Sequence, residues 1–414
     1  MIIIVGSGAG GATVAKELAL AGLPVTLIEK GPLLITQQAF TAYDARDNDL
    51  ELLKTTCGGG STMVSVGNGV RVLQEELKSL GIDISIELAE AEQELKVNPL
   101  PDSHLGKGTK LLMEAAYNLD LPIQSMPKFI RPSECIPCGK CSFGCPRNAK
   151  WTAMDFINEA KEAGAQIFFN TGLEKIIIEK GKLKGVNIRR NFQDTTILNS
   201  SDQTSQYIKT DLVILAAGAI ETPRILQKSG IKAGNNLFMD TFVTVGGILK
   251  DIEFYEEVMM ATLVPFDNFI LAPHFSTFLL EKLKNYGAQG KDILGIMVKI
   301  KDENSGQVTP EKVFKQNTLQ DVRFLAEGSA VAGSILSEAG VKPSTIISTH
   351  PRGAHPGGTA PIGKIVDENL ETSVKGLFLS DASVLPFAPG APPILTIIAL
   401  AKRLAQHIIK KYAD

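Results

Sequence analysis

The first thirty residues combine two apolar runs with a glycine-rich turn, and this pattern restricts the fold more than any other feature of the chain. An apolar run at residues 2–5 precedes Gly6, and a helical pattern then continues to a stop at Gly22. A second apolar run at residues 24–28 is followed by Glu29. Strand, glycine turn, helix, strand and acid in this order form the fingerprint of a dinucleotide-binding βαβ unit. The order predicts an α/β chain that opens with a doubly wound, Rossmann-like domain.

Each position of the G-x-G-x-x-G turn has a physical role in this interpretation. Gly6 makes the tight turn, Gly8 lets the backbone approach a pyrophosphate, and Gly11 lets the helix pack closely on the strand. The helix N-terminus faces the phosphates, and Glu29 accepts hydrogen bonds from the adenosine ribose. A glycine-rich turn without a ligand is the alternative. The predicted dinucleotide contacts in this unit are Gly6, Gly8, Ala9, Gly10, Gly11, Glu29 and Lys30.

The fingerprint alone does not choose between NAD and FAD, and three later segments bear on that choice. A glycine-rich loop at residues 55–62 leads to Asn68, and such a loop lets backbone N–H groups approach a cofactor closely. A buried-strand pattern at residues 211–215 ends in small residues that include Ala217. A third apolar run at residues 376–379 is followed by an acid. All three segments are typical of chain that lies beside a bound cofactor.

Four of the five cysteines of the chain lie in one short run, C-x2-C-x2-C-x3-C-P. This spacing is typical of the thiolates that bind an iron–sulfur cluster. Zinc is the main alternative, although zinc sites usually combine two separate Cys pairs, and reduced bystander thiols are a third. We expect a 4Fe–4S cluster rather than a 3Fe–4S cluster, with Cys145 rather than Cys57 as the fourth ligand. The predicted metal ligands are Cys135, Cys138, Cys141 and Cys145.

Bulk composition excludes several classes of function. The 414-residue chain is long enough for two or three domains with a substantial core. A net charge of −3 without a basic run argues against nucleic acid and against an anionic membrane surface. No apolar stretch approaches the ~20 residues of a membrane span, and we expect no signal peptide before the first strand. Cysteines spaced for metal binding favour a reducing, cytoplasmic location, and the cluster favours anaerobic metabolism.

In combination, these motifs resemble the glucose–methanol–choline (GMC) family of FAD-dependent oxidoreductases. The resemblance covers residues 1–75, about 165–235 and 340–414, and it includes the sequence HPGGTAPIG at 355–363. The stretch 138–150 also resembles a Cys-rich segment of long-chain alcohol oxidases in this family. Some bacterial sugar dehydrogenases of the family carry an iron–sulfur cluster near the flavin. The resemblance therefore implies FAD and is compatible with a cluster.

The resemblance also implies where further residues lie relative to FAD. Asp381 lies near the ribityl–pyrophosphate portion, residues 59–61 lie near the isoalloxazine, and the strand that contains Lys175 passes the adenine. The additional cofactor contacts that it implies are Gly59, Gly60, Ser61, Asn68, Lys175, Ala217, Asp381 and Ala382. The expected division is 1–75, 165–239 and 341–414 for the FAD-binding domain, 76–164 for a helical insert with a Cys-rich loop at 130–150, and 240–340 for a smaller α+β substrate domain.

His355 aligns with the catalytic histidine of the family in the pattern H-P-x-G-T. A neutral imidazole in that role takes the proton of a substrate hydroxyl while a hydride passes to the flavin. The family has a second His or Asn in the closing segment, where this chain has Pro392. Proline carries no side-chain donor or acceptor. His350 is a candidate to replace that partner, with a solvent-facing loop residue as the alternative.

A flavin exchanges two electrons with an organic substrate, whereas a cluster carries one electron at a time. The pair therefore predicts an FAD and iron–sulfur dehydrogenase that acts on an alcohol-type small molecule and delivers electrons to ferredoxin or another protein carrier. A ferredoxin-dependent reductase of a C=C or C=O bond is the first alternative. An electron-transfer subunit of a larger, multisubunit redox complex is the second.

Overall fold

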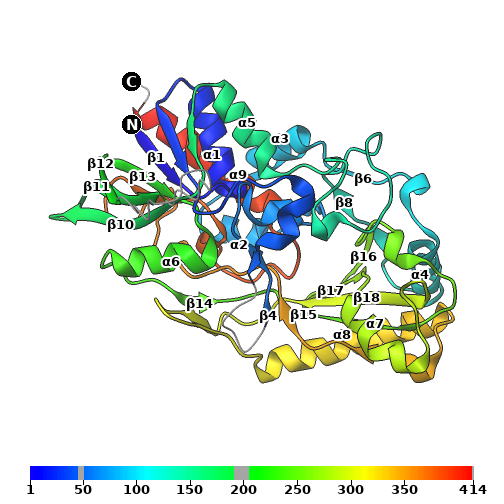
Figure 1. Cartoon of the computed structure of the whole chain (residues 1–414). Coiled ribbons are helices and arrows are strands. Elements are labelled where there is room, and N and C mark those ends of the chain that lie inside the picture. Colours follow the sequence, from blue (N-terminus) through cyan, green and yellow to red (C-terminus); the bar gives the residue numbers. More distant parts are fainter. Residues whose placement is uncertain (45–50, 191–204, 413–414) are drawn as a thin grey trace, which may run out of the picture.

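The computed structural model describes residues 1–44, 51–190 and 205–412, and it is organised around two sheets (Figure 1). The first sheet is parallel, with the strand order β23-β13-β1-β2-β9. Its central strands are short apolar runs that are buried along their whole length, as expected for a parallel sheet covered on both faces. The strands are β1 (Ile2–Val5), β2 (Val25–Ile28), β9 (Gln166–Phe168), β13 (Leu212–Leu215) and β23 (Leu377–Leu379).

Three helices pack together beside the parallel sheet. Helix α1 (Ala9–Leu20) lies between α5 (Ala153–Glu162) and α9 (Ile394–Tyr412), and it contacts β1 and β2. Helix α5 begins at a capping box in which Thr152 and Asp155 satisfy each other's backbone N–H groups. Helix α9 starts directly after Pro393 and is almost completely buried along one face. The α/β, Rossmann-like domain predicted from the sequence is confirmed by this arrangement.

An antiparallel sheet adds a further layer, of which only the strand that contains Lys175 was expected, from the family resemblance. It has the order β10-β11-β12 and contacts β2 and helix α6 (Gly218–Lys228). Its inward side chains, which include Ile176 and Val186, join the main core. The strands are β10 (Thr171–Glu179), β11 (Lys182–Arg190) and β12 (Ser205–Lys209).

The second large sheet is mostly antiparallel and lies below the first in Figure 1. Its order is β4-β22-β15-β18-β17-β16-β7, and β21 pairs with β15. Every residue of β15 and β18 is buried, because helix α8 (Leu319–Glu338) covers both strands. The strands are β4 (Glu51–Leu52), β7 (Gln124–Ser125), β15 (Phe242–Ile248), β16 (Thr262–Pro265), β17 (Phe269–Pro273), β18 (Ile293–Ile300), β21 (Ile347–Ser348) and β22 (Arg352–Gly353).

The remaining elements are short. The longer helices among them are α2 (Gln74–Ser79), α3 (Ser85–Leu95), α4 (Lys107–Asn118) and α7 (Thr277–Leu283). Small strand pairs are formed by β3 (Tyr43–Asp44) with β5 (Lys54–Thr55), by β6 (Asn98–Pro99) with β8 (Pro127–Lys128), and by β19 (Gly306–Val308) with β14 (Asn235–Leu237) and β20 (Val313–Phe314). In the part of the chain that the structure describes, no helix has the length and apolar character needed to cross a membrane.

The segment after β22 joins the two sheets. Gly357 forms a β-bridge with Phe238, which lies just before β15. The Gly358 N–H donates to the Ala382 carbonyl at 3.1 Å, and Ala382 lies just after β23. The carboxyl edge of the parallel sheet is therefore directly connected to one end of the antiparallel sheet. The domain boundaries at 75, 164, 239 and 340 stay a prediction.

Candidate functional site

The turn between β1 and α1 brings helix α1 close to the end of β23 but leaves open space beside Gly8. A Cβ atom added at Gly10 would lie 1.8 Å from the Ser380 carbonyl oxygen, at the end of β23. At Gly8, the N-cap of α1, an added Cβ would meet no described heavy atom within 4 Å. Gly10 is thus required by packing, whereas Gly8 borders an open space at the helix N-terminus.

The N-terminus of α1 fits a phosphate group. Among the described residues, no side chain caps this helix, and its first turn carries no acidic residue. The first N–H groups of a helix have no intrahelical partner and carry a partial positive charge. An anion placed beside Gly8 would satisfy these groups, as in dinucleotide-binding folds.

Glu29 lies at the end of β2, beside the same turn. Its Oε2 accepts hydrogen bonds from Ser7 N at 3.0 Å and from Ser7 Oγ at 2.7 Å, and its Oε1 accepts from Gly31 N at 2.8 Å. Burial raises the pKa of Glu29, and these hydrogen bonds oppose that rise. Lys30 is exposed and forms an ion pair with Glu221 at 3.4 Å. The structure therefore places Glu29 beside the β1–α1 turn and leaves Lys30 at the surface, and their contact with a dinucleotide stays a prediction.

Asp381 links two of the cofactor segments. Its Oδ2 accepts hydrogen bonds from Gly218 N at 2.9 Å and from Thr222 Oγ1 at 2.6 Å, and its Oδ1 accepts from Ser383 N at 2.8 Å. Ala217 is the N-cap of α6, so this contact fixes the start of that helix next to β23. Lys175, by contrast, lies exposed on β10.

The glycine-rich loop at residues 55–69 reaches the β1–α1 turn. It contains the one-turn helix η2 (Gly60–Val64), and Gly59 N donates to Ser7 Oγ at 3.1 Å. A Cβ at Gly60 would lie 3.1 Å from Gly8 Cα, so the two backbones nearly touch. Ser61 is exposed, and its Oγ accepts from Thr55 N at 3.2 Å. The predicted contacts from both segments are therefore brought together.

His355 lies in the loop after β22 and faces a buried acid that the sequence analysis did not identify. Its Nδ1 is 3.0 Å from Asp240 Oδ2, and Asp240 is fully buried. The other carboxylate oxygen, Oδ1, accepts from Gly390 N at 2.9 Å. No hydrogen bond to His355 Nε2 is formed by any described residue. The ring is thus held through Nδ1, and Nε2 remains available to accept a proton.

Lys299, on β18, lies beside this pair. Its Nζ is 3.4 Å from His355 Nδ1 and 3.5 Å from the Asp240 backbone carbonyl, and the side chain is buried. Burial lowers the pKa of Lys299 to about 8, and Asp240 opposes that fall. Burial also raises the pKa of Asp240 to about 7, against the effect of Lys299. The pKa of His355 falls well below 6.5, because the ring, with its side chain 22% exposed, is largely desolvated and faces Lys299.

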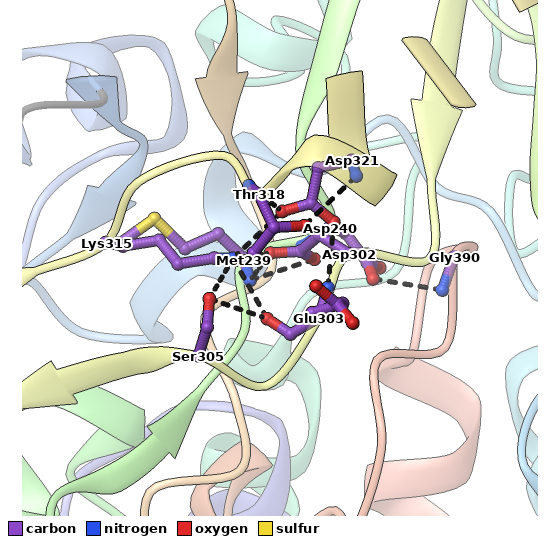
Figure 2. A network of polar contacts seen from close by, with 9 residues as sticks. All are labelled: Met239, Asp240, Asp302, Glu303, Ser305, Lys315, Thr318, Asp321 and Gly390. Atoms are coloured by element: carbon purple, nitrogen blue, oxygen red, sulfur yellow. Dashed lines mark hydrogen bonds and ion pairs between the residues drawn. The ribbon is translucent and has the colours of Figure 1, made fainter. Parts of the chain in front are cut away.

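A second buried charge network holds the backbone of Asp240 through Asp302 (Figure 2). Asp302 accepts from Asp240 N at 2.7 Å and forms an ion pair with Lys315 at 2.9 Å. Asp321 accepts from Thr318 N at 2.9 Å, completes the capping box of helix α8 with Thr318, and lies 3.5 Å from Lys315 Nζ. Burial raises the pKa of Asp302 to about 6. Because its own amide is held, the Asp240 backbone has little freedom to move.

His350 lies in a different environment. It is about half exposed, its Nε2 is 3.1 Å from Glu51 Oε2, and its ring packs edge-on against Phe278. The structure thus gives His350 partners at the surface. Pro392 is buried in the closing segment, two residues after Gly390. Within the described chain, the hydrogen-bond contacts of the His355 ring are made by Asp240 and Lys299, not by His350.

The cysteine loop (residues 130–150) lies against the glycine-rich loop. Its one-turn helix η4 (Cys141–Phe143) contacts η2, and Ala153 N, just after the loop, donates to Thr62 Oγ1 at 2.9 Å. Burial, together with nearby Cys141, Cys145 and Cys138, raises the pKa of Cys135 to about 11. The thiols gather, but within residues 1–44, 51–190 and 205–412 no three His, Cys, Asp or Glu side chains are arranged to hold a metal ion.

Two buried lysines lie between these loops. Lys150 Nζ donates to the carbonyls of Thr62, Met63 and Ser65, at 2.6 to 3.0 Å. Lys128 Nζ donates to Asn68 Oδ1 at 2.6 Å and to two backbone carbonyls. Burial lowers the pKa of Lys128 to about 7 and that of Lys150 to about 8, whereas Cys141 raises both.

Among the described residues, the hydrogen-bond partners of the two ammonium groups are all neutral, so an anion at the cysteine loop would compensate their charge. Cys57 lies apart from the loop cysteines, buried with Ala39, Met63 and Val64.

Several of these residues escaped the sequence analysis. Asp240, Lys299 and Lys128 carry no motif, and Lys150 was noted only as the end of the Cys-rich segment 138–150, without a role of its own. One signal was available, because Lys299 interrupts the apolar run ILGIMVKI and a charged residue is almost never fully buried without a partner. Ser7 stands inside the fingerprint, at a position that the G-x-G-x-x-G pattern leaves open.

Comparisons with known proteins agree with this geometry. The GMC oxidoreductase family model matches residues 35–251 and, in its C-terminal part, 303–401; an NAD(P)-binding Rossmann-like domain matches 4–47. An uncharacterised protein of Methanocaldococcus jannaschii is 36% identical over 410 residues, 98% of this chain and 99% of that protein. A long-chain-alcohol oxidase of Arabidopsis thaliana is 23% identical over 511 residues, 99% of this chain and 68% of that protein.

Solved structures show the same fold. Formate oxidase has a TM-score of 0.77 at 15% identity, with 100% of this chain and 98% of that chain covered. Pyridoxine 4-oxidase from Mesorbium loti has a TM-score of 0.74 at 15% identity, with 98% of each chain covered. Family model, fold and cofactor cradle agree, and the chain therefore belongs to the FAD-binding GMC oxidoreductase family.

Proposed function

We propose that this protein is an FAD-dependent oxidoreductase that oxidises an alcohol-type small molecule and uses His355 as the base. One observation carries the proposal: His355 is held through Nδ1 by buried Asp240, which leaves Nε2 without a described partner. The loop that bears it is anchored to Ala382, beside Asp381. A base must lie within hydrogen-bond reach of the proton that it takes, and this loop extends from the FAD-binding edge of the parallel sheet.

The residues present fit FAD. The open space at Gly8, the uncapped start of α1 and the close approach of Gly60 lie together at the N-terminus of α1, where a pyrophosphate would be held. Bound FAD supplies a two-electron acceptor for hydride. The substrate hydroxyl gives its proton to His355 Nε2, and the C–H electron pair leaves carbon with the hydrogen as the C=O bond forms. Asp240 stabilises the positive charge that develops on the imidazole.

The substrate class rests on the family and on its relatives. Curated relatives in Arabidopsis thaliana are named long-chain-alcohol oxidases. We infer a primary alcohol or a comparable CH–OH compound as the substrate. The absence of a family-type partner at Pro392 favours one second candidate, a reductase of a C=C or C=O bond that receives its electrons from ferredoxin, because such a reaction depends less on that partner.

We further propose that the cysteine loop binds an iron–sulfur cluster through Cys135, Cys138, Cys141 and Cys145, as 4Fe–4S rather than 3Fe–4S. Three observations support it: the ligand spacing, the contact of η4 with η2, and the two buried lysines that lack an anionic hydrogen-bond partner in the described chain. The cluster would carry single electrons to ferredoxin or another protein carrier.

The test of the alcohol oxidation is anaerobic mixing of the FAD-loaded protein with primary alcohols of increasing chain length, followed by flavin absorbance. We expect bleaching with at least one alcohol. His355→Ala should slow it by about 10²–10⁴-fold, the usual contribution of a positioned base, with FAD still bound. His407→Ala, on α9, is the matched control and should reduce at the wild-type rate.

Bleaching of His355→Ala at the wild-type rate would overturn the role of His355. Bleaching by reduced ferredoxin, but by no alcohol, would instead favour the reductase. Failure of both, in a protein that copurifies with an unrelated redox enzyme, would favour an electron-transfer subunit.

A further inference from the structure

Pro392 leaves His355 without the side-chain partner that the GMC family usually provides, and the structure supplies two other residues in its place. We propose that Asp240 and Lys299 act as a positioning pair for His355: they keep the ring proton on Nδ1 and so leave Nε2 free as the base. The proposal rests on the role of His355 stated above. It assigns functions to two residues that no sequence motif marks.

Asp240 is built as a fixed acceptor. Its backbone adopts a φ of +47°, which is unusual for a residue other than glycine. The contacts to Gly390 N through Oδ1 and to Asp302 through its own amide determine the direction of the carboxylate. Oδ2 then faces His355 Nδ1 at 3.0 Å. The closing segment that carries Pro392 thus contributes a backbone donor to Asp240.

The charge of Asp240 decides which nitrogen of His355 carries the proton. An ionised carboxylate only accepts, so Nδ1 must be the protonated nitrogen and Nε2 has the free lone pair. A protonated carboxyl can donate to Nδ1, and the ring proton then moves to Nε2, which can no longer accept. The His355–Asp240 contact is therefore productive only while Asp240 is an anion.

Lys299 is the buried cation that favours this anion. Its Nζ contacts the Asp240 carbonyl at 3.5 Å and lies 3.4 Å from Nδ1. One ring nitrogen cannot donate to Asp240 and accept from Lys299, and the shorter Asp240 contact takes precedence. Lys299 therefore acts through its charge. The pKa of Asp240 shows this effect: burial raises the pKa, and among the opposing influences Lys299 lowers it most.

Other charged side chains also affect the pKa values of Asp240 and Lys299. Lys301 lowers the pKa of Asp240 from the solvent side, whereas Asp302 raises the pKa of Lys299. Lys315 neutralises Asp302 in an ion pair at 2.9 Å. In the part of the chain that the structure describes, neither Lys301 nor Lys315 forms a hydrogen bond or ion pair with His355 or with the Asp240 side chain. Lys299 is therefore the cation with the most direct effect.

The test is direct observation of the His355 ring in the FAD-loaded protein. The five histidines are labelled with ¹⁵N, and long-range ¹H–¹⁵N spectra at about pH 7.5 distinguish an Nδ1–H ring from an Nε2–H ring. The His355 signals are assigned by their loss in His355→Ala. We expect Nδ1–H in the wild type and a change to Nε2–H in Lys299→Met. Lys299→Gln keeps a donor for the Asp240 carbonyl and should show the same change if Lys299→Met does not fold.

Lys301→Met is the matched control, because it removes an exposed lysine charge two residues along the chain, where solvent screens it. It should retain Nδ1–H. An Nε2–H ring in the wild type, or an unchanged ring in both Lys299 variants, would overturn the proposal. These spectra need no substrate. Failure of the positioning pair is therefore distinguishable from failure of alcohol oxidation, which is measured by flavin bleaching.

Discussion

His355 owes its chemical state to residues that enclose it rather than to its own sequence motif. Burial and Lys299 lower its pKa well below 6.5, so the imidazole is neutral near pH 7. Neutrality is necessary for a base but not sufficient, because the proton must also be on the correct nitrogen. Asp240 keeps the ring proton on Nδ1 only while its carboxylate is ionised. Because burial raises the pKa of Asp240 to about 7, this requires a pH above about 7.

This arrangement predicts a pH dependence with a definite sign. As pH falls through about 7, Asp240 takes up a proton and His355 Nε2 stops being an acceptor, so the rate of flavin reduction by alcohol should fall. Well below pH 7 the loss should be about tenfold per pH unit, as for one titrating group. In Asp240→Asn the step near pH 7 should disappear and the plateau should be lower. Rapid-mixing measurements of flavin reduction across pH 5.5–9 decide this, and an unchanged step in Asp240→Asn would exclude Asp240 as its source.

At the scale of elements, the β1–α1 turn shows that neighbouring glycines in one turn serve different purposes. Gly10 lets α1 approach the end of β23, where any Cβ would overlap the Ser380 carbonyl. Gly8 has space around it and an ordinary φ of −69°. Gly10 therefore contributes to folding stability, and Gly8 keeps room for a ligand at the helix N-terminus.

Two alanine substitutions separate these contributions. Gly10→Ala should destabilise the protein by about 1–3 kcal/mol, the usual cost of overpacking, and this should appear in denaturant unfolding even without FAD. Gly8→Ala should leave the unfolding of the FAD-free protein within about 0.5 kcal/mol of wild type but weaken FAD binding, measured by fluorescence titration. Equal FAD affinity in Gly8→Ala and wild type would show that the open space is not the cofactor cradle.

At the scale of the whole molecule, the cysteine loop adjoins the part of the chain that carries the predicted isoalloxazine contacts. Lys150 connects the two through three backbone carbonyls between Thr62 and Ser65. A cluster on this loop would lie next to the flavin rather than at the opposite end of the protein. Exchange of single electrons between the two centres requires such proximity.

Anaerobic purification with iron and sulfide analysis and low-temperature EPR tests the cluster. We expect iron and sulfide in the wild type and their loss in Cys141→Ser, with FAD retained, since the cofactor cradle does not involve this thiol. Cys57→Ser, a buried cysteine outside the loop, is the matched control and should keep its iron. A zinc-loaded, iron-free wild type would contradict the cluster and the one-electron relay.

The sequence predicted much of the FAD-binding half, because its signals are local. Buried strands of three or four apolar residues, a glycine turn and a following acid are short-range requirements, and β1, α1, β2, β13 and β23 lie where they predict. Of the antiparallel layer, only the strand that contains Lys175 was expected, and only from the family resemblance. The pairing of β10, β11 and β12 into a sheet was not predicted, because alternation in a partly exposed strand is a weaker signal.

What the sequence by itself determined is the fold of the nucleotide-binding unit, the grouping of the thiols and the identity of His355 as a candidate base. What only the tertiary structure decided is which residues control that base. Asp240 is 115 residues from His355 in sequence and Lys299 is 56 residues away. Their roles depend on burial and on a separation of about 3 Å. Such proximity arises from the packing of β15 and β18 against the loop after β22, and no local pattern encodes it.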